Sequence, residues 1–279
     1  MWFELCLLFI FTSLCTSSFL TTNYTTVAIY ASYTTVRATS FVESPTTNIN
    51  TTTILAKETT DRMNFTISWF EFKNAFLTNG FDSPGMGNFH KFKKEAFRLG
   101  GIESKREAAM FLAQIIHESG GLRFKEEERC KLNITACMND YKDTKHDVKG
   151  KLYYGRGYIQ LTWSVNYLAA SKDIFGDSRL LNTPEIVAKD DYLAWAVSFW
   201  YWKTRVRTHP GVLRGEFGSS TNRINGAIEC LPVPTQTAIN RFIIYTKVLK
   251  SFNITEKPNS FGCKSYLKSR PYFKIPFFD

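Results

Sequence analysis

The chain has 279 residues, of which 44% are hydrophobic and 15% aromatic. This composition is sufficient for a packed core and excludes a wholly disordered protein. The formal net charge is +10, but the basic residues are scattered along the chain, so the charge alone indicates no nucleic-acid partner. After the first residues, no stretch is apolar for the ~20 positions that a membrane span requires, and we expect no membrane span.

Residues 1–18 have the length and order of a secretory signal peptide, with an apolar run followed by small polar residues. Glu4 stands where such peptides usually carry a basic residue. Between Thr16 and Thr60, 15 residues are Thr and 5 are Ser. Such a segment buries too little apolar surface to fold alone, so we expect a disordered stalk over residues 19–60 of a secreted protein. Asn-x-Thr sequons are candidate glycosylation sites and occur at Asn23, Asn50, Asn64, Asn133 and Asn253.

The cysteines indicate a disulfide-bonded domain. Removal of the signal peptide would take away Cys6 and Cys15 and leave an even number in an oxidising compartment. The remaining cysteines, Cys130, Cys137, Cys230 and Cys263, allow three pairings. We favour Cys130–Cys137 and Cys230–Cys263, since each pair would bridge a local loop.

Folded structure is expected from Asp61 onward, and its helices are indicated by capping boxes and apolar spacing. Ser68 and Glu71 have the spacing of one box, and Ser104 and Glu107 have the spacing of another. The pattern predicts helices over about 68–77, 88–99, 104–118, 192–202 and 240–250. The fourth of these is aromatic or small on all sides, so we expect its tryptophans to lie mainly in the core, at Trp195, Trp200 and Trp202.

The third predicted helix carries a carboxylate on its apolar face. Glu118 follows Phe111 by seven residues and Ile115 by three, so it projects from the same side as both. An anion near the negative end of a helix is disfavoured. Glu118 must therefore either pair with a cation or lie half-buried in a cleft that favours its protonated form. Gly120 and Gly121 should end the helix and reverse the chain.

A second carboxylate, Glu127, follows nine residues later within an acidic triplet. An acidic triplet is ordinarily a solvated turn, but two carboxylates across a cleft are what glycosidic hydrolysis requires. The stretch 151–167 adds glycines, aromatic rings and amides that suit sugars, although a hairpin or a helix start would have the same composition. His117 and Glu118 could open a zinc motif, but Gly121 stands at its second histidine, so we expect no metal and no cofactor.

Several blocks resemble the signature sequences of family 19 glycoside hydrolases, the plant and bacterial type chitinases. They occur in the same order from about Ser68 to Leu249, at residues 117–121, 124–127, 153–162, 180–188, 196–202 and 221–230. The resemblance implies a mainly α, two-lobed lysozyme-like domain over residues 61–279, with small irregular or β segments. It also implies endo-acting, inverting hydrolysis of chitin or chitooligosaccharides, which are β-1,4-linked polymers of N-acetylglucosamine. We expect this enzyme to be a monomer.

Carried over residue by residue, the resemblance implies that Glu118 is the general acid and Glu127 the general base. Thr162 would help to hold the attacking water. The implied substrate-binding residues are Tyr154, Gln160, Asn166 and Asn222, with Arg241 near the acid and His117 at the helix end. The sequence departs from the family at Tyr158, where a proline is usual, and at Ser164, where an asparagine is usual.

Two other functions remain open at this stage. Related folds cut peptidoglycan, and the positive net charge would suit an anionic bacterial wall. A catalytically inactive glycan-binding protein is the other alternative, and the presence of both glutamates with Thr162 and Asn222 argues against it.

Overall fold

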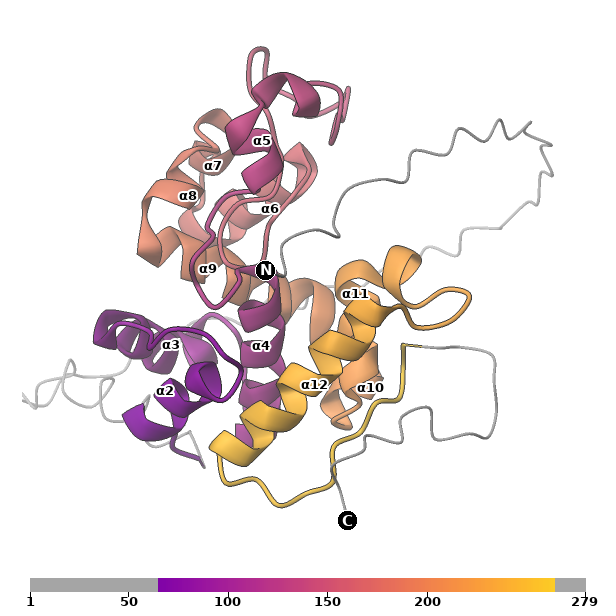
Figure 1. Ribbon diagram of the computed structural model, residues 1–279. Helices are drawn as coiled ribbons and strands as arrows, with labels where there is room; N and C mark the ends of the chain where they lie inside the picture. The colour runs from indigo at the N-terminus through magenta and orange to yellow at the C-terminus, as the bar shows by residue number, and fades with distance from the viewer. Residues whose placement is uncertain (1–64, 264–279) are drawn as a thin grey trace, which may run out of the picture. The chain divides into compact units, whose positions relative to one another are not determined.

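The computed structural model describes residues 65–263 (Figure 1). The expected signal peptide, the expected stalk and the chain after Cys263 lie outside the described residues. Within that range the β structure is confined to the isolated bridges Glu126–Arg156 and Arg156–Leu161. The predicted mainly α fold with small β segments is therefore confirmed.

The helices are α2 (Trp69–Leu77), α3 (Met86–Arg98), α4 (Lys105–Glu118), α5 (Glu128–Leu132), α6 (Ser164–Phe175), α7 (Arg179–Asn182), α8 (Ile186–Lys189), α9 (Asp191–Tyr201), α10 (Pro210–Leu213), α11 (Phe217–Glu229) and α12 (Gln236–Ser251). A 3₁₀ segment covers Ile134–Cys137, and a π-helical turn covers Trp202–Val206. All five predicted helices are present, as α2, α3, α4, α9 and α12. The spacing does not predict the remaining helices, which are the short α5, α7, α8 and α10 and the longer α6 and α11.

The two predicted capping boxes differ in the structure. At α2 the box is complete, because Ser68 accepts from the Glu71 backbone and Glu71 accepts from the Ser68 backbone. At α4, Ser104 Oγ accepts from the Glu107 backbone at 3.1 Å. The Glu107 carboxylate accepts from Glu103 N at 3.2 Å rather than from the Ser104 backbone, and it also accepts from Trp202 Nε1 at 2.9 Å and Arg207 Nε at 2.8 Å. The second box is therefore half formed, since its glutamate is used in the core.

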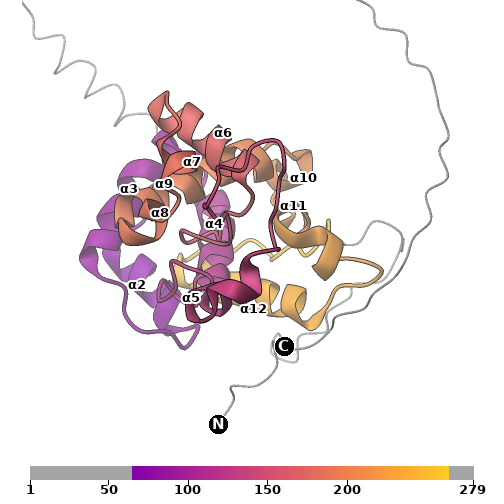
Figure 2. The same cartoon turned by 90° about the horizontal axis from the view of Figure 1, so that it is seen from above.

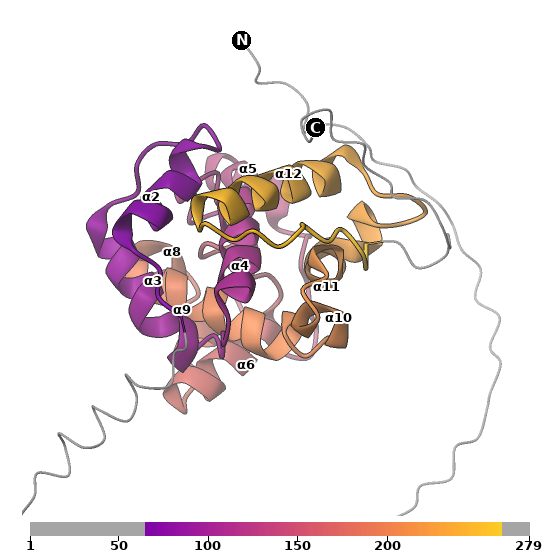
Figure 3. The same cartoon turned by 90° about the horizontal axis from the view of Figure 1, so that it is seen from below.

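Helix α4 runs through the middle of the described domain, with α12 alongside it (Figures 1 and 3). Every residue from Glu107 to Ile116 is buried, so α4 has no solvent-facing side there. The expectation of a single apolar face is wrong, because polar side chains between the apolar ones find partners inside. Gln114 Nε2, for example, donates to Ser220 Oγ at 2.8 Å and to Thr221 Oγ1 at 3.1 Å.

The core around α4 is largely aromatic. The Phe111 ring stacks on Phe199 with centroids 4.5 Å apart, and Trp195 stacks on Phe199 at 5.6 Å. Trp195 and Trp202 are 0% exposed and Trp200 is 4% exposed, which confirms that these tryptophans belong to the core.

Two groups of helices give the domain its lobes. Helices α5 to α8 and their loops gather beyond the C-terminal end of α4, whereas α2, α3 and α10 to α12 lie along its length (Figures 1 and 2). None of the helices between residues 65 and 263 is long and apolar enough to cross a membrane.

Both favoured disulfides are present. Cys130 is bonded to Cys137, and Cys230 is bonded to Cys263. The second bond holds the last described residues against α11, where Phe217 N donates to Asn259 O at 2.9 Å. The segment before Cys263 is thereby fixed to the helix that leads into Cys230.

Candidate active site

Glu118 is the last residue of α4, and the chain turns away directly after it. Gly120 and Gly121 have φ of +55° and +72°, which L side chains rarely adopt, and Gly121 N donates to Ile116 O at 2.9 Å. A Cβ at Gly121 would also lie 2.5 Å from the Phe81 ring. The predicted double-glycine stop therefore places Glu118 at the exposed end of a buried helix.

The Glu118 carboxylate pairs with a buried arginine. Its Oε1 lies 2.6 Å from Arg241 Nη2 on α12, and the two side chains are 17% and 2% exposed. Arg241 also donates from Nε and Nη2 to the two carboxylate oxygens of Glu229 at 2.8 and 2.7 Å, and from Nη1 to Gln114 Oε1 at 3.0 Å. A bidentate pair of this kind fixes the guanidinium in one orientation. Of the two expectations for Glu118, the cation partner is therefore the one that the structure shows.

The surroundings of Arg241 keep it charged. Burial alone would lower the pKa of Arg241, but the nearby Glu118 and Glu229 carboxylates raise that pKa above its ordinary value. Asn225 supports the same pair, since its Nδ2 donates to Glu229 Oε1 at 2.8 Å from a non-helical kink inside α11. The result is a buried network with Glu118 at its solvent-facing end.

His117, beside the candidate acid, lies in an environment that opposes its protonation. Burial, together with the positive charge of Arg241, lowers the pKa of His117 to about 3. The ring is therefore neutral at physiological pH. Among residues 65–263 the ring itself makes no hydrogen bond, whereas the His117 carbonyl accepts from Gly120 N at 3.4 Å.

We expect His117 to make stability depend on pH. Below about pH 6.5 the unfolded chain binds a proton at this ring that the folded protein does not bind until about pH 3. Stability that is fully present above pH 6.5 should thus be lost as the pH falls, by up to ~1.4 kcal/mol per unit. Urea unfolding at pH 7, 5 and 4 should show a shallower decline for His117→Gln than for the parent. The matched change of an exposed histidine, His90→Gln, should keep the parent slope; equal slopes for all three proteins would contradict the prediction.

Glu127 lies on the loop between α4 and α5, directly before α5. The loop pairs with a second segment, because Glu127 N donates to Gly155 O at 2.8 Å and Gly157 N donates to Lys125 O at 2.9 Å. The Glu127 carboxylate is 21% exposed and lies 3.3 Å from Arg129 Nη2. Its Oε2 also accepts from Gly155 N at 3.3 Å. Glu127 is therefore a partly exposed carboxylate on a backbone-anchored loop.

Tyr154, expected to bind sugar, is used inside the protein. It is 5% exposed, its hydroxyl donates to Glu126 Oε1 at 2.5 Å, and its ring lies 3.7 Å from the Arg156 guanidinium. Tyr167 completes the arrangement by donating to the Tyr154 carbonyl at 2.8 Å. These contacts fix the segment that pairs with the Glu127 loop, so Tyr154 holds that loop in place through buried contacts.

Three predicted residues lie close together before and within α6. Gln160 adopts φ +54°, and its Nε2 donates to Gly157 O at 2.9 Å. Asn166 Nδ2 donates to Thr162 O at 3.0 Å, which ties the start of α6 to the residue expected to hold water. Thr162 and Gln160 are half-buried, so their side chains can still meet a ligand.

Asn222, an expected substrate-binding residue, contacts the segment before Cys263. It lies exposed on α11, and its Nδ2 donates to Gly262 O at 2.9 Å beside the Cys230–Cys263 disulfide. This amide therefore anchors the last described residues of the chain.

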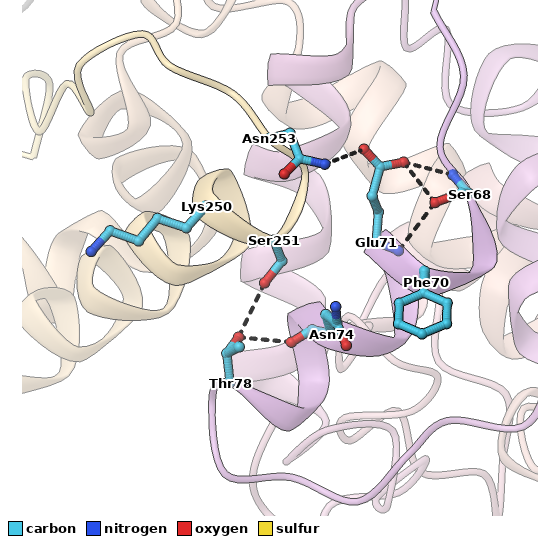
Figure 4. Close-up of a pocket in the computed structure, with 8 residues that line it drawn as sticks. All are labelled: Ser68, Phe70, Glu71, Asn74, Thr78, Lys250, Ser251 and Asn253. Carbon is cyan, nitrogen blue, oxygen red and sulfur yellow. Dashed lines mark hydrogen bonds between the residues drawn. The ribbon is translucent and has the colours of Figure 1, made fainter.

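The pocket drawn in Figure 4 lies between α2 and the end of α12. The carboxylate of Glu71 accepts hydrogen bonds there from Ser68 N at 2.8 Å and Asn253 Nδ2 at 3.3 Å. The lining consists of Ser68, Phe70, Glu71, Asn74, Thr78, Lys250, Ser251 and Asn253. None of the predicted catalytic or substrate-binding residues is among them, so this pocket does not mark the candidate active site.

One group of metal-ligand types gathers within the described part of the chain. Single ligand atoms of Glu127, Cys130 and Cys137 lie within 4.8 Å of one another. The two sulfurs are bonded to each other, so they are not thiolates that could hold an ion. The group fits a disulfide beside a carboxylate and does not fit a metal centre.

The sequence does not assign four residues of the site: Gln114, Glu126, Glu229 and Tyr141, whose pKa is raised by burial and by the charge of Glu127. Gln114 lies one helical turn before Glu118, and that spacing could have placed it beside the acid. Glu229 lies within block 221–230, which resembles the family, so the resemblance could have indicated that this glutamate belongs to the site.

The fold and site together define a class of protein. A partly exposed carboxylate at the end of a buried helix, with a second on an adjoining loop of a two-lobed helical domain, is the arrangement of lysozyme-like glycoside hydrolases. The chain belongs to glycoside hydrolase family 19, since the family model described as chitinase class I matches residues 94–263.

Individual relatives agree with this family. Endochitinase EP3 of Arabidopsis thaliana is 34% identical over 195 residues, which cover 68% of this chain and 66% of that protein. Chitinase C from Streptomyces griseus HUT6037 has a similar structure, with a TM-score of 0.56 and 27% identity over 71% of this chain and 80% of that one. The crystal structure of a bacterial family 19 chitinase is also similar, with a TM-score of 0.55 and 27% identity. The match covers 70% of this chain and 98% of that one. The chain spans about half to two thirds of the length of the curated relatives it matches.

Proposed function

We propose that the protein is a secreted, endo-acting chitinase that hydrolyses β-1,4-linked N-acetylglucosamine polymers with inversion. The observation that carries the proposal is the network of Glu118, Arg241 and Glu229, which holds one partly exposed carboxylate at the end of a buried helix. The family and the relatives named as chitinases support the substrate. The two disulfides suit an oxidising compartment and so support secretion.

Glu118 is the proposed general acid. Its Oε1 forms an ion pair with Arg241, whereas Oε2 makes no hydrogen bond or ion pair within residues 65–263. Oε2 is therefore the oxygen that would carry the proton to the leaving glycosidic oxygen. The bond from C1 to that oxygen breaks as the proton arrives, and the leaving sugar departs as an alcohol.

Glu127 is the proposed general base, with Thr162 as the residue that positions water. The base removes a proton from water as the water oxygen attacks C1 from the face opposite the leaving group, so the anomeric configuration inverts. This single displacement needs room for a water molecule, and we expect the carboxyl groups to lie roughly 6.5–9.5 Å apart in the substrate complex.

Product analysis on chitohexaose tests the proposal. Anomer-resolved detection of early products should show shorter chitooligosaccharides whose new reducing ends are in the α configuration. Products with β ends would contradict inversion, and absence of cleavage would contradict the activity. Bacterial cell walls should be incubated in parallel, since lysis of walls without cleavage of chitohexaose would identify a peptidoglycan hydrolase instead.

A further inference from the structure

Two aromatic residues near Glu127 have backbone conformations that bulky side chains avoid. Trp163 has φ +70° and ψ +130°, and Tyr141 has φ +55°. A positive φ is uncommon outside glycine, and for large side chains it is a clear and energetically costly outlier. Such strain persists only where the surrounding structure or a function requires it.

The strain at Trp163 belongs to the backbone turn. Trp163 N donates to Tyr153 O at 2.9 Å, and its carbonyl accepts from Asn166 N at 2.9 Å as α6 begins. A glycine would satisfy both hydrogen bonds without strain. The core does not explain the large side chain either, because Trp163 is 42% exposed. The indole is therefore a costly group held at the surface.

Tyr141 holds this indole in place. The two rings meet edge to face, with centroids 5.7 Å apart and planes at 87°. Tyr141 also packs against the buried cluster of Cys130, Cys137 and Tyr154, which helps to fix its position. We call Trp163 and Tyr141 the aromatic pair.

The aromatic pair adjoins the proposed catalytic residues. Burial and then the charge of Glu127 raise the pKa of Tyr141, since its hydroxyl faces that carboxylate and Arg129. Trp163 directly follows Thr162, the proposed water-positioning residue. Tyr141 thus lies between the exposed indole and Glu127, and the indole belongs to the residue next to Thr162 in the sequence.

We propose that the exposed face of Trp163 is a binding site for one N-acetylhexosamine ring of the substrate chain, beside Glu127. A pyranose ring presents a face of C–H groups that packs on an aromatic ring, and a fixed indole loses little freedom on binding. This inference rests on the proposed function, because it assigns part of the same glycan chain to a named side chain. It makes Trp163 a residue that sets affinity for long substrates rather than a catalytic residue.

Binding of chitohexaose to a Glu118→Gln background, measured by titration calorimetry, tests the site without turnover. Adding Trp163→Gly should weaken binding about 5- to 10-fold, the effect of losing one aromatic contact. The thermal unfolding midpoint should not fall, because glycine relieves the positive φ. The matched control Phe70→Ala removes another exposed ring, 68% exposed on α2, and should leave binding unchanged.

A second variant keeps the test decisive if the glycine variant fails to fold. Trp163→Leu retains the apolar bulk and the strained backbone but has no ring face, so it should weaken chitohexaose binding to a similar extent. Parent-like affinity in either folded variant would overturn the inference while leaving the chitinase proposal intact. If the unsubstituted protein neither hydrolyses chitohexaose nor, with Glu118→Gln, binds it, both proposals are overturned.

Discussion

Replacement of Glu118 by Gln is expected to lower kcat for chitohexaose by about 10²–10⁴-fold, the contribution typical of a positioned general acid. The amide has no proton acidic enough to transfer to the leaving oxygen. Folding should be preserved, because the Gln carbonyl can still accept from Arg241 and because Glu229 still balances the charge of that arginine. Initial rates and urea unfolding of the same preparation measure both effects.

Glu128→Gln is the matched control for this change. Glu128 is an exposed acidic residue directly after the proposed base, at the start of α5, so the substitution removes the same charge from the surface beside the candidate site. It should leave kcat within about 2-fold of the parent, as surface changes usually do. Parent-like turnover by Glu118→Gln would refute the assignment of the acid.

Replacement of Arg241 by Met is expected to destabilise the protein by about 3–5 kcal/mol, since it leaves the Glu229 carboxylate buried without its cation. Activity should fall as well, because Glu118 loses the contact at 2.6 Å that orients it. Urea unfolding at pH 7 measures the first effect and chitohexaose hydrolysis the second.

A double variant separates stability from function in this network. Arg241→Met with Glu229→Leu removes both buried charges, and such replacements are often neutral or stabilising. It should therefore recover much of the lost stability without recovering activity. If Arg241→Met alone lowers the free energy of unfolding by less than about 1 kcal/mol, the network contributes little to folding.

The local features of the site could be predicted from sequence. The end of α4 follows from apolar spacing and two glycines, and those signals lie within one turn of Glu118. The fourth predicted helix was also placed well, because residues that are apolar on all sides leave few alternatives to the core. Signals that act over a few residues therefore located the proposed acid.

Long-range features could not be predicted in the same way. Only the family resemblance led to the expectation that Arg241 lies near Glu118, because Arg241 comes from a helix that begins more than a hundred residues after α4. No spacing rule gives its 3.0 Å contact with Gln114. The same limit explains why α4 was expected to have one apolar face, since the partners of Gln114 lie on α11. It also explains Tyr154, whose residue type suits a sugar contact but whose hydroxyl is taken by Glu126.

The two proposed carboxylates depend on different parts of the chain. Glu118 is held by α4, α11 and α12, whereas Glu127 and the aromatic pair are held by the contiguous segment from residue 126 to 167. Under the two proposals, substitutions or insertions in that segment are expected to alter which glycans are accepted without disturbing the buried contacts of Glu118. The fold would then let the substrate range evolve while the proposed proton donor is preserved.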